Sequence, residues 1–371
     1  MRVLLWYWGR RGGGAQFALG LARALSLQPG LAVRLSLSAQ LEGLEAFHAL
    51  GVPMQIVETY RSRAGFLAAL PHLPARRRAL LTAAGEADVV LSAMTHLWTP
   101  LIAPALALGG HAFVPVVHDA MPHPGDANLF WDWRLGREVG AARAAVALSD
   151  SVAHALAARA PGLPLIRMAL PALVTPSASK VPQDGPPTFV FFGRLRAYKG
   201  LDLLRDAWAL FQPRHPDSRL LVMGEGDANA CAPGLAALAG VTIKARWVAE
   251  HEIAALLGQA TAVVLPYREA SQSGVVPQAL ALGVPVVATP VGGLVEQVRE
   301  GAGGVVATTV TATALADAMA RVLAPGALPL LRAEARAAAA GATDWDGAAA
   351  TLVDGLRTVM TSAPASGMLH A

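Results

Sequence analysis

The stretch LPYREASQSGVVPQALALGVPVVATPVGGLVEQV, from Leu265 to Val298, decides the fold. Its pattern predicts the end of a buried strand, a polar turn rich in serine and glycine, a short apolar helix, a second strand and a Gly-Gly turn into another helix. Small residues let a ligand approach the backbone, and the N–H groups at the start of a helix point toward anions. Two consecutive strand-to-helix turns of this kind predict a site for a phosphate or a sugar.

The same alternation of short apolar strands and helices continues outward from this stretch in both directions. Strands after residue 187 are expected at Thr188–Phe192, Arg219–Met223, Val241–Lys244, Ala262–Leu265, Val284–Ala288 and Gly304–Ala307. Strands before it are expected at Val3–Trp8, Leu31–Leu37, Met54–Val57, Asp88–Ser92, Phe113–Val117 and Ala144–Leu148. Continuous apolar strands that alternate with helices indicate a parallel sheet covered on both faces.

A polar, proline-rich segment, TPSASKVPQDGPP at 175–187, interrupts this alternation and reads as a linker. The fold class is therefore α/β, with two Rossmann-like, doubly wound parallel-sheet domains facing a cleft, where ligands bind at the carboxyl ends of the strands. The predicted divisions are an N-terminal domain at 1–172, a linker at 173–187, a C-terminal domain at 188–342, a helix at 343–361 that packs back on the N-terminal domain, and a disordered tail at 362–371.

The composition narrows the class of protein. Of the 371 residues, 54% are hydrophobic and 15% are charged, which excludes a disordered chain. The net charge of +4 suits anionic ligands or a membrane surface but is too small by itself to indicate nucleic acid. The single cysteine allows no intrachain disulfide and indicates a reducing compartment. No secretory signal or membrane-spanning segment is recognisable, so a soluble, cytoplasmic protein is expected.

A glycine-rich loop follows the first predicted strand and includes Gly12, Gly13 and Gly14. A dinucleotide-binding fingerprint would need a third glycine where Phe17 stands and an acid at the end of the second strand, which ends in Leu37-Ser38 instead. An NAD-binding site is therefore disfavoured. Two interpretations stay open, a flexible loop on the acceptor side of the cleft and a tight turn with a structural role.

A second turn, Gly193-Arg-Leu-Arg-Ala-Tyr-Lys-Gly200, follows the first strand of the C-terminal domain. Its Arg194 and Lys199 lie five residues apart, where both side chains can reach one diphosphate. Arginine offers planar bidentate contacts and lysine a compact point charge. The alternative is an exposed basic turn, but the position at the carboxyl end of a strand favours a binding role.

Three segments in this order, FFGRLRAYKGLDLL, LVMGEGD and the stretch at 265–298, resemble the C-terminal half of the retaining glycosyltransferases of family 4, which have the GT-B fold. The resemblance implies that Arg194 and Lys199, with Gly193, bind the diphosphate of a nucleotide-sugar donor. It also implies that the turn beginning Gly224-Glu225 lies near the nucleotide. The N-terminal domain would then hold the acceptor.

The chain departs from this family at its Glu-x7-Glu motif. The second glutamate, which holds the ribose hydroxyls, falls on Gln278, and the first, which faces the donor sugar, falls on Ala270, with Glu269 one residue earlier. A glutamine still hydrogen-bonds a diol, without the strength of a charged acceptor. The chain resembles a sub-branch with a Gln-Ser-Gly-Val turn, in which the donor is held by Ser271, Gln272, Ser273, Gly274 and Val275 through hydroxyl and backbone N–H groups.

A histidine candidate lies at the end of an N-terminal strand, in Val116-Val117-His118-Asp119. The resemblance implies that His118 lies near the transferred sugar. Read by itself, a lone histidine is as well explained as a core residue. Asp119 and His123 are further candidates on the acceptor side.

No spacing of histidines, cysteines or carboxylates typical of a metal site is recognisable. The sequence therefore predicts a metal-independent enzyme without a cofactor, in which Arg194 and Lys199 neutralise the leaving diphosphate. The donor would be a UDP- or GDP-linked sugar, and the acceptor a glycan or a lipid-linked glycan.

A basic stretch in the N-terminal domain carries Arg61, Arg63, Arg76, Arg77 and Arg78 among apolar residues. A basic, partly amphipathic helix can dock on anionic lipid. A solvated helix face explains the same pattern, so a peripheral position on the inner membrane face is one of two interpretations.

The resulting hypothesis is a retaining glycosyltransferase of polysaccharide or glycolipid assembly, which moves a sugar from a nucleotide-sugar donor to an acceptor hydroxyl. A phosphorylase or hydrolase on the same fold would use phosphate or water as the acceptor. A non-catalytic nucleotide-sugar-binding module is a rival from another class, because the carboxylates at 270 and 278 are missing.

Overall fold

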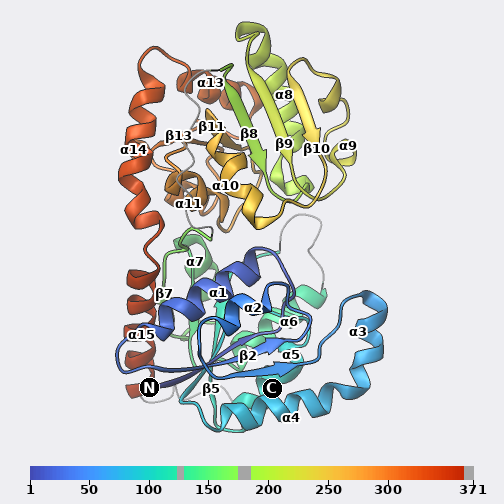
Figure 1. Cartoon of the computed structure of the whole chain (residues 1–371), viewed down its shortest axis with the longest axis vertical. Helices are drawn as coiled ribbons and strands as arrows, with labels where there is room; N and C mark the ends of the chain where they lie inside the picture. Colours follow the sequence, from blue (N-terminus) through green and yellow to red (C-terminus); the bar gives the residue numbers. More distant parts are fainter. Residues whose placement is uncertain (123–128, 174–184, 363–371) are drawn as a thin grey trace. The chain divides into compact units, whose positions relative to one another are not determined.

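The computed structural model of the chain describes residues 1–122, 129–173 and 185–362, which form two compact units (Figure 1). The described part of the N-terminal unit comprises residues 1–122, 129–169 and 345–362, and that of the C-terminal unit comprises residues 170–173 and 185–344. Each unit is built on one parallel sheet flanked by helices. The predicted fold class, two Rossmann-like α/β domains with parallel sheets, is confirmed.

The sheet of the N-terminal unit has the order β3-β2-β1-β4-β5-β6-β7, and every neighbouring pair is parallel. The chain starts in the middle, winds outward through β2 and β3, and then returns to continue on the other side with β4. The strands are β1 (Arg2–Tyr7), β2 (Ala32–Ser38), β3 (Met54–Val57), β4 (Val89–Ser92), β5 (Ala112–Val117), β6 (Ala145–Ala147) and β7 (Leu165–Arg167). The sequence did not predict β7, which has only three residues and directly follows Pro164.

Helices cover both faces of this sheet. They are α1 (Gly13–Ser26), α2 (Leu44–His48), α3 (Arg63–Ala69), η1 (Leu70–His72), α4 (Leu73–Ala84), α5 (Thr99–Leu108), α6 (Leu129–Gly140), α7 (Asp150–Arg159) and α15 (Trp345–Thr361). The last helix, α15, returns from the end of the chain and packs against α1 and β7. At its start, the Trp345 ring lies against Phe17 of α1 (centroids 5.7 Å apart) and against the backbone of Gly20.

The sheet of the C-terminal unit has the order β10-β9-β8-β11-β12-β13 and is also parallel throughout. Its strands are β8 (Thr188–Phe192), β9 (Arg219–Met223), β10 (Val241–Lys244), β11 (Ala262–Leu265), β12 (Val286–Ala288) and β13 (Gly304–Val306). The first four have the predicted bounds. The direction of winding reverses between β8 and β11, which lie side by side with Phe189 opposite Ala262.

The helices of this unit are η2 (Ala197–Lys199), α8 (Leu201–Phe211), η3 (Gln212–Arg214), α9 (Ala228–Cys231), η4 (Leu235–Ala237), α10 (Glu250–Gly258), α11 (Val275–Ala281), α12 (Leu294–Gln297), α13 (Ala312–Val322) and α14 (Ala327–Ala342). The stretch at 265–298 therefore has the predicted order: the end of β11, a polar turn, α11, β12, a Gly-Gly turn and α12. In the described part of the chain no single helix is long and apolar enough to cross a membrane, whereas α13 and α14 together reach that length and composition across an 89° bend.

The cores of the two units explain the continuous apolar strands. In the C-terminal unit, Val263, Val264 and Leu265 of β11 are fully buried, and so are Val286 and Val287 of the neighbouring β12. Alternate residues of a strand point to opposite faces of its sheet, so consecutive apolar residues are required when helices cover both faces. This burial leaves the ends of the strands, and above all the reversal between β8 and β11, as the places where polar side chains gather.

Candidate functional site

The candidate site of the C-terminal unit lies at the carboxyl edge of its sheet, around the reversal between β8 and β11. A ligand can enter such a reversal because the connections leave the two neighbouring strands in opposite directions. The turns after β8, β9 and β11, together with α11, carry all of the donor-side residues predicted from the sequence: Gly193, Arg194, Lys199, Gly224, Glu225, Glu269, Ser271, Gln272, Ser273, Gly274, Val275 and Gln278.

The turn after β8 is fixed to the turn after β9 by its backbone. The Gly193 N–H donates to Met223 O (3.1 Å), and the Leu195 N–H donates to Glu225 O (2.9 Å). Gly224 has a φ of +153°, and a Cβ at this position would lie 1.8 Å from Gly193 O. Only glycine allows the two turns to approach this closely.

The end of the same turn is fixed to the turn after β11. Gly200 has a φ of +69° and caps α8, and a Cβ there would lie 1.9 Å from Pro266 O. The Arg268 N–H donates to Tyr198 O (2.8 Å), and the Arg268 guanidinium pairs with Asp202 of α8. The three turns thus form one continuous backbone layer, which carries the exposed Arg194 and the partly buried Lys199.

Aromatic rings surround the Lys199 side chain. Its Nζ lies 3.7 Å from the centroid of the Tyr267 ring and 5.1 Å from that of Tyr198. Both distances are within the range of a cation–π contact, and the shorter one is with a ring that is fully buried. The sequence analysis did not select Tyr267, which lies two residues after the predicted strand Ala262–Leu265.

The serine turn after β11 is held by a side chain that the sequence analysis also missed. The Ser273 N–H donates to Gln297 Oε1 (2.7 Å), and Gln297 Nε2 donates back to Ser273 O (3.2 Å), so the amide of α12 clamps the turn. The Val275 N–H points to Ser273 Oγ at 3.3 Å. The expectation that Ser273 offers its backbone N–H to a phosphate is therefore wrong for this conformation, because Gln297 already accepts that hydrogen bond.

The two positions that replace the glutamates of the family motif are both buried. Ala270 is enclosed, and its carbonyl accepts from the Gly293 N–H (3.0 Å). Gln278 of α11 is 5% exposed, and its Oε1 has no hydrogen-bond partner among the described residues. A buried acceptor without a donor costs about 1–3 kcal/mol, which a ligand hydroxyl that reached this atom would recover.

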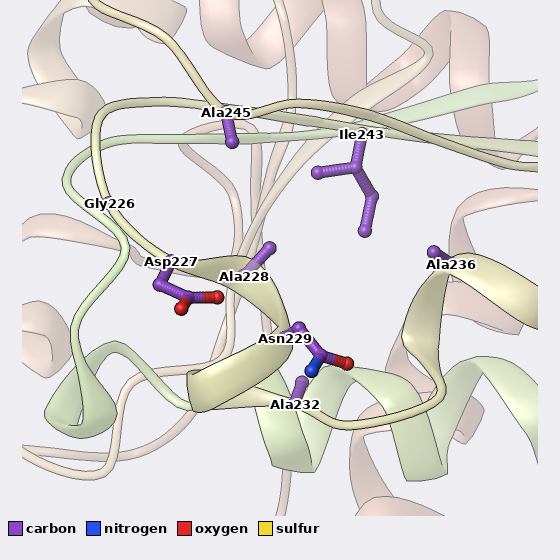
Figure 2. Close-up of a pocket in the computed structure, with 8 residues that line it drawn as sticks. All are labelled: Gly226, Asp227, Ala228, Asn229, Ala232, Ala236, Ile243 and Ala245. Atoms are coloured by element: carbon purple, nitrogen blue, oxygen red, sulfur yellow. The ribbon is translucent and has the colours of Figure 1, made fainter.

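A cavity of about 370 Å³ lies next to the turn after β9. Figure 2 shows Ile243 extending from β10 toward α9, which carries Asn229 and is directly followed by Ala232 on the other side of the cavity. The remaining walls are Gly226, Asp227, Ala228, Ala236 and Ala245. Small apolar side chains with one nearby amide and one carboxylate suit a flat, partly polar group.

The candidates of the N-terminal unit lie at the carboxyl ends of β1 and β5. His118 follows β5, its ring packs edge-on against Phe17 (4.9 Å), and its Nε2 lies 3.0 Å from Ala93 O. A carbonyl only accepts, so Nε2 carries the proton and Nδ1 the lone pair. Burial lowers the pKa of His118, which keeps the ring neutral at pH 7. Asp119 beside it is partly buried, and His123 lies outside the described residues.

The glycine loop after β1 serves the packing of this unit. Gly12 has a φ of +79° at the start of α1, where Gly13 is the first helical residue. A Cβ on the buried Gly14 would lie 2.5 Å from Met94 Sδ, so the start of α1 sits directly on the turn after β4. These contacts explain by packing why the loop contains glycines. Its role toward an acceptor stays a prediction.

Glu138 of α6 is a buried carboxyl that the sequence analysis missed. It is 1% exposed, its Oε2 accepts from Thr95 Oγ1 (2.8 Å), and its Oε1 has no partner among the described residues. Burial raises its pKa to about 7, partly offset by the Thr95 hydrogen bond and the charge of Arg134. Through this hydrogen bond, Glu138 joins α6 to the turn after β4, close in sequence to Ala93.

We expect Glu138→Gln to change how the stability of the protein depends on pH. The folded-state pKa lies above the unfolded value, so the carboxyl keeps its proton between pH 4.5 and 7 in the folded protein only. The stability that the protonated carboxyl contributes to the folded protein is complete at low pH and is lost as the pH rises. The unfolding free energy of the variant minus that of the wild type should therefore grow by roughly 3 kcal/mol between pH 4.5 and 7.5. Urea denaturation at several pH values measures this difference.

Glu45→Gln provides the control, because Glu45 is an exposed glutamate of α2 in the same unit. The difference in unfolding free energy between Glu45→Gln and the wild type should stay constant over the same pH range. A difference in unfolding free energy that is equally constant for Glu138→Gln would contradict the raised pKa of the buried carboxyl.

Among the described residues, no three histidine, cysteine, aspartate or glutamate side chains gather in a way that could hold a metal ion. Metal independence stays a prediction, which an assay with a chelator addresses.

The comparisons with known proteins agree with this fold. Residues 186–325 match the family model described as glycosyl transferases group 1. The glycogen synthase of Mycobacterium tuberculosis H37Rv is 32% identical over 259 residues, which cover 65% of this chain and 62% of the relative. The D-inositol 3-phosphate glycosyltransferase of Corynebacterium urealyticum is 30% identical over 181 residues, which cover 46% of this chain and 43% of the relative. The chain thus spans less than two thirds of the length of these relatives.

Two solved structures share the architecture of the whole chain. The Anabaena protein HepE, solved in complex with UDP and glucose, superposes with a TM-score of 0.75 at 18% identity and covers 96% of this chain and 100% of its own. Sucrose-phosphate synthase from Thermosynechococcus elongatus superposes with a TM-score of 0.73 at 17% identity, over 96% of this chain and 98% of its own. The fold of this protein is GT-B, and its residues 186–325 are similar in sequence to the group 1 glycosyl transferases.

Proposed function

We propose that this protein is a glycosyltransferase that moves a sugar from a nucleoside-diphosphate sugar to an acceptor hydroxyl. The observation that carries the proposal is the pair Arg194 and Lys199 on the turn after β8, at the reversal of a sheet whose sequence matches the group 1 glycosyltransferases. The departing nucleoside diphosphate is an anion. Two cations fixed at its position stabilise that charge as it develops, which is often the largest single contribution to catalysis.

The rest of the carboxyl edge supplies places for the other parts of the donor. The cavity beside Gly226 suits the nucleotide base, and the buried Gln278 Oε1 suits a ribose hydroxyl. The donor is proposed to be UDP- or GDP-linked, and HepE is a protein of the same fold that was solved with UDP and glucose. The acceptor, a glycan or a lipid-linked glycan, is assigned to the N-terminal unit with His118, Asp119 and the glycine loop.

The finer assignment is a retaining enzyme of glycosyltransferase family 4 that needs no metal and no cofactor, in polysaccharide or glycolipid assembly. In this mechanism the leaving phosphate takes the proton of the acceptor hydroxyl, and neutral His118 orients the sugar. The anomeric configuration of the product, measured by NMR, tests retention. Turnover that persists in a chelator supports metal independence, and turnover that a divalent cation restores contradicts it.

A thermal-shift screen against nucleoside diphosphates and their sugars tests the proposal first, because a ligand that binds only the folded state raises the melting temperature. Turnover assays with the best donor then separate the rivals. Release of free sugar without any acceptor would indicate a hydrolase, and sugar phosphate formed with inorganic phosphate would indicate a phosphorylase. Donor binding without turnover on any acceptor would support a non-catalytic module.

Replacing Gln278 tests the ribose contact. We expect Gln278→Leu to weaken binding of the preferred nucleoside diphosphate by about tenfold, because a ligand hydroxyl loses its acceptor, while the unliganded protein is at least as stable as before. Gln278→Glu keeps an acceptor at the same place and should bind within threefold of the wild type or more tightly. Calorimetric titration measures both. Unchanged affinity of the leucine variant would remove Gln278 from the site.

A surface of the N-terminal unit supports the proposal of a peripheral membrane enzyme in the cytoplasm. Residues 59–85, which include α3 and α4, contain five arginines, Arg61, Arg63, Arg76, Arg77 and Arg78, and no aspartate or glutamate. Arg77 and Arg78 are exposed, and Leu67 is 66% exposed. Cations next to exposed apolar side chains match an anionic lipid surface.

Arg76 does not belong to this surface. Its Nε donates to Glu58 O, its Nη1 donates to Ala69 O (2.9 Å), and its guanidinium lies over the Trp98 ring. The Arg76 side chain turns inward because the carbonyl of Glu58, just after β3, and the carbonyl of Ala69, at the end of α3, lie beside it. The predicted lipid contact of Arg76 is therefore replaced by an internal structural role.

We expect the double substitution Arg77→Ser and Arg78→Ser to weaken binding to vesicles of phosphatidylcholine with phosphatidylglycerol by at least tenfold, at roughly 1 kcal/mol for each basic residue near an anionic surface. Vesicle co-sedimentation measures the binding. Arg23→Ser with Arg219→Ser removes the same charge from exposed positions elsewhere and should bind like the wild type. Equal binding of both double variants would refute the membrane proposal.

A further inference from the structure

Tyr267 connects the two turns that meet at the reversal of the C-terminal sheet. It is the second residue after β11 and is fully buried. One face of its ring lies under Lys199, with Nζ 3.7 Å from the centroid. Its hydroxyl lies 3.3 Å from Ser273 Oγ. A single rigid side chain thus contacts the cation of the β8 turn and the hydroxyl of the β11 turn.

The Lys199 ammonium contacts a ring that carries no charge. Burial raises the pKa of Tyr267 to about 12, so the phenol is neutral at pH 7 and attracts the ammonium only through the negative face of its ring. A carboxylate in this place would neutralise Lys199 and compete with a phosphate. A ring face occupies no N–H donor, so this contact does not compete with phosphate oxygens for the ammonium.

The backbone of Tyr267 and the serine beside its hydroxyl are held as well. Its carbonyl accepts from Thr289 Oγ1 at the end of β12, and Ser273 is clamped by the Gln297 amide. A tyrosine side chain has only two rotatable bonds, so a ring held at both ends has little freedom. By contrast a free lysine side chain loses about 2 kcal/mol of rotamer entropy when it is immobilised.

We propose that Tyr267 is a positioning residue for the donor diphosphate: its ring holds the Lys199 ammonium in place before the donor binds, and its hydroxyl keeps the Ser273 turn at a fixed separation from that ammonium. This inference rests on the proposed function, because it takes Lys199 as a diphosphate ligand. A preorganised cation binds more tightly because its ordering cost is met during folding. Tyr267 itself touches no reacting atom.

A double-mutant cycle tests the coupling between the two side chains. UDP and GDP are each titrated calorimetrically into the wild type, Tyr267→Leu, Lys199→Met and the double variant. We expect Tyr267→Leu to weaken binding of the preferred nucleotide by about tenfold when Lys199 is present and by less than twofold when residue 199 is methionine. A core tyrosine without this role would cost the same in both backgrounds, and that result would overturn the inference.

A second series of substitutions at position 267 covers the case in which the Tyr267→Leu variant does not fold. Phenylalanine, 4-fluoro-, 3,5-difluoro- and 3,4,5-trifluorophenylalanine are placed at 267, which weakens the ring quadrupole in steps with little change of shape. Affinity for the nucleotide should fall step by step with Lys199 present and stay level in Lys199→Met. The same series at Tyr198, whose centroid is 5.1 Å from Nζ, should give a smaller slope. A level series at 267 would overturn the inference.

The wild-type titration separates the two proposals. If the wild type binds neither UDP nor GDP, the proposed function fails and the inference fails with it. If the wild type binds and the cycle shows no coupling, the proposed function stands and only the role of Tyr267 is lost.

Discussion

Replacing Arg194 or Lys199 with alanine is expected to lower kcat/KM for sugar transfer by about 100- to 1,000-fold each, the loss typical when one fixed group that stabilises transition-state charge is removed. Both side chains lie on the turn after β8, at the reversal of the sheet. The charge on the diphosphate grows as the sugar leaves, so the loss should fall mainly on kcat. Steady-state kinetics with the preferred donor measures it.

Arg196→Ala is the matched control, because Arg196 is an exposed arginine on the same turn. It should keep kcat/KM within threefold of the wild type and rule out a general effect of charge. Circular dichroism and melting temperatures should show that all three variants are folded. Turnover of Arg194→Ala or Lys199→Ala at the wild-type rate would refute the assignment of the site.

Gly200→Ala is expected to destabilise the C-terminal unit by about 3 kcal/mol and to abolish nucleotide binding at the temperature of the assay. The new Cβ would lie 1.9 Å from Pro266 O, and the backbone at a φ of +69° is itself unfavourable for alanine. Relief requires the β8 turn to move away from the β11 turn, which displaces Lys199 from Tyr267. Thermal unfolding and nucleotide titration measure the two effects.

Gly234→Ala separates the two causes of this loss. Gly234 has a φ of +83°, and nothing lies within 4 Å of its Cβ position. Its substitution should therefore cost only about 1 kcal/mol, the penalty of the left-handed backbone conformation, and leave nucleotide affinity unchanged. If both alanine variants lose the same stability, the close approach to Pro266 has no energetic role.

The strands of the C-terminal unit could be predicted closely because their pattern is local. Val263, Val264 and Leu265 follow one another without a polar residue, which happens only where helices cover both faces of a sheet. By contrast β7 was missed, since three residues after Pro164 carry too little pattern to distinguish a strand from a loop.

The candidate site could be predicted in part. Arg194 and Lys199 are recognisable because charged residues after an apolar strand mark the carboxyl edge of a sheet. Tyr267 and Gln297 could not be found in this way, because their roles depend on contacts with Lys199 and Ser273, 68 and 24 residues away. Nor does a sequence show that Arg76 turns inward while Arg77 and Arg78 stay exposed.

The stretch at 265–298 shows what the sequence determines and what only the tertiary structure decides. Its own residues determine two strand-to-helix turns, because the alternation of apolar runs with serine and glycine is a local property of the chain. The tertiary structure alone decides which groups of those turns are available. The Ser273 N–H is taken by Gln297, the Gln278 Oε1 is buried without a donor among the described residues, and Tyr267 faces Lys199. Hydrogen bonding and burial depend on which segments fold against the turn, and those segments lie elsewhere in the sequence.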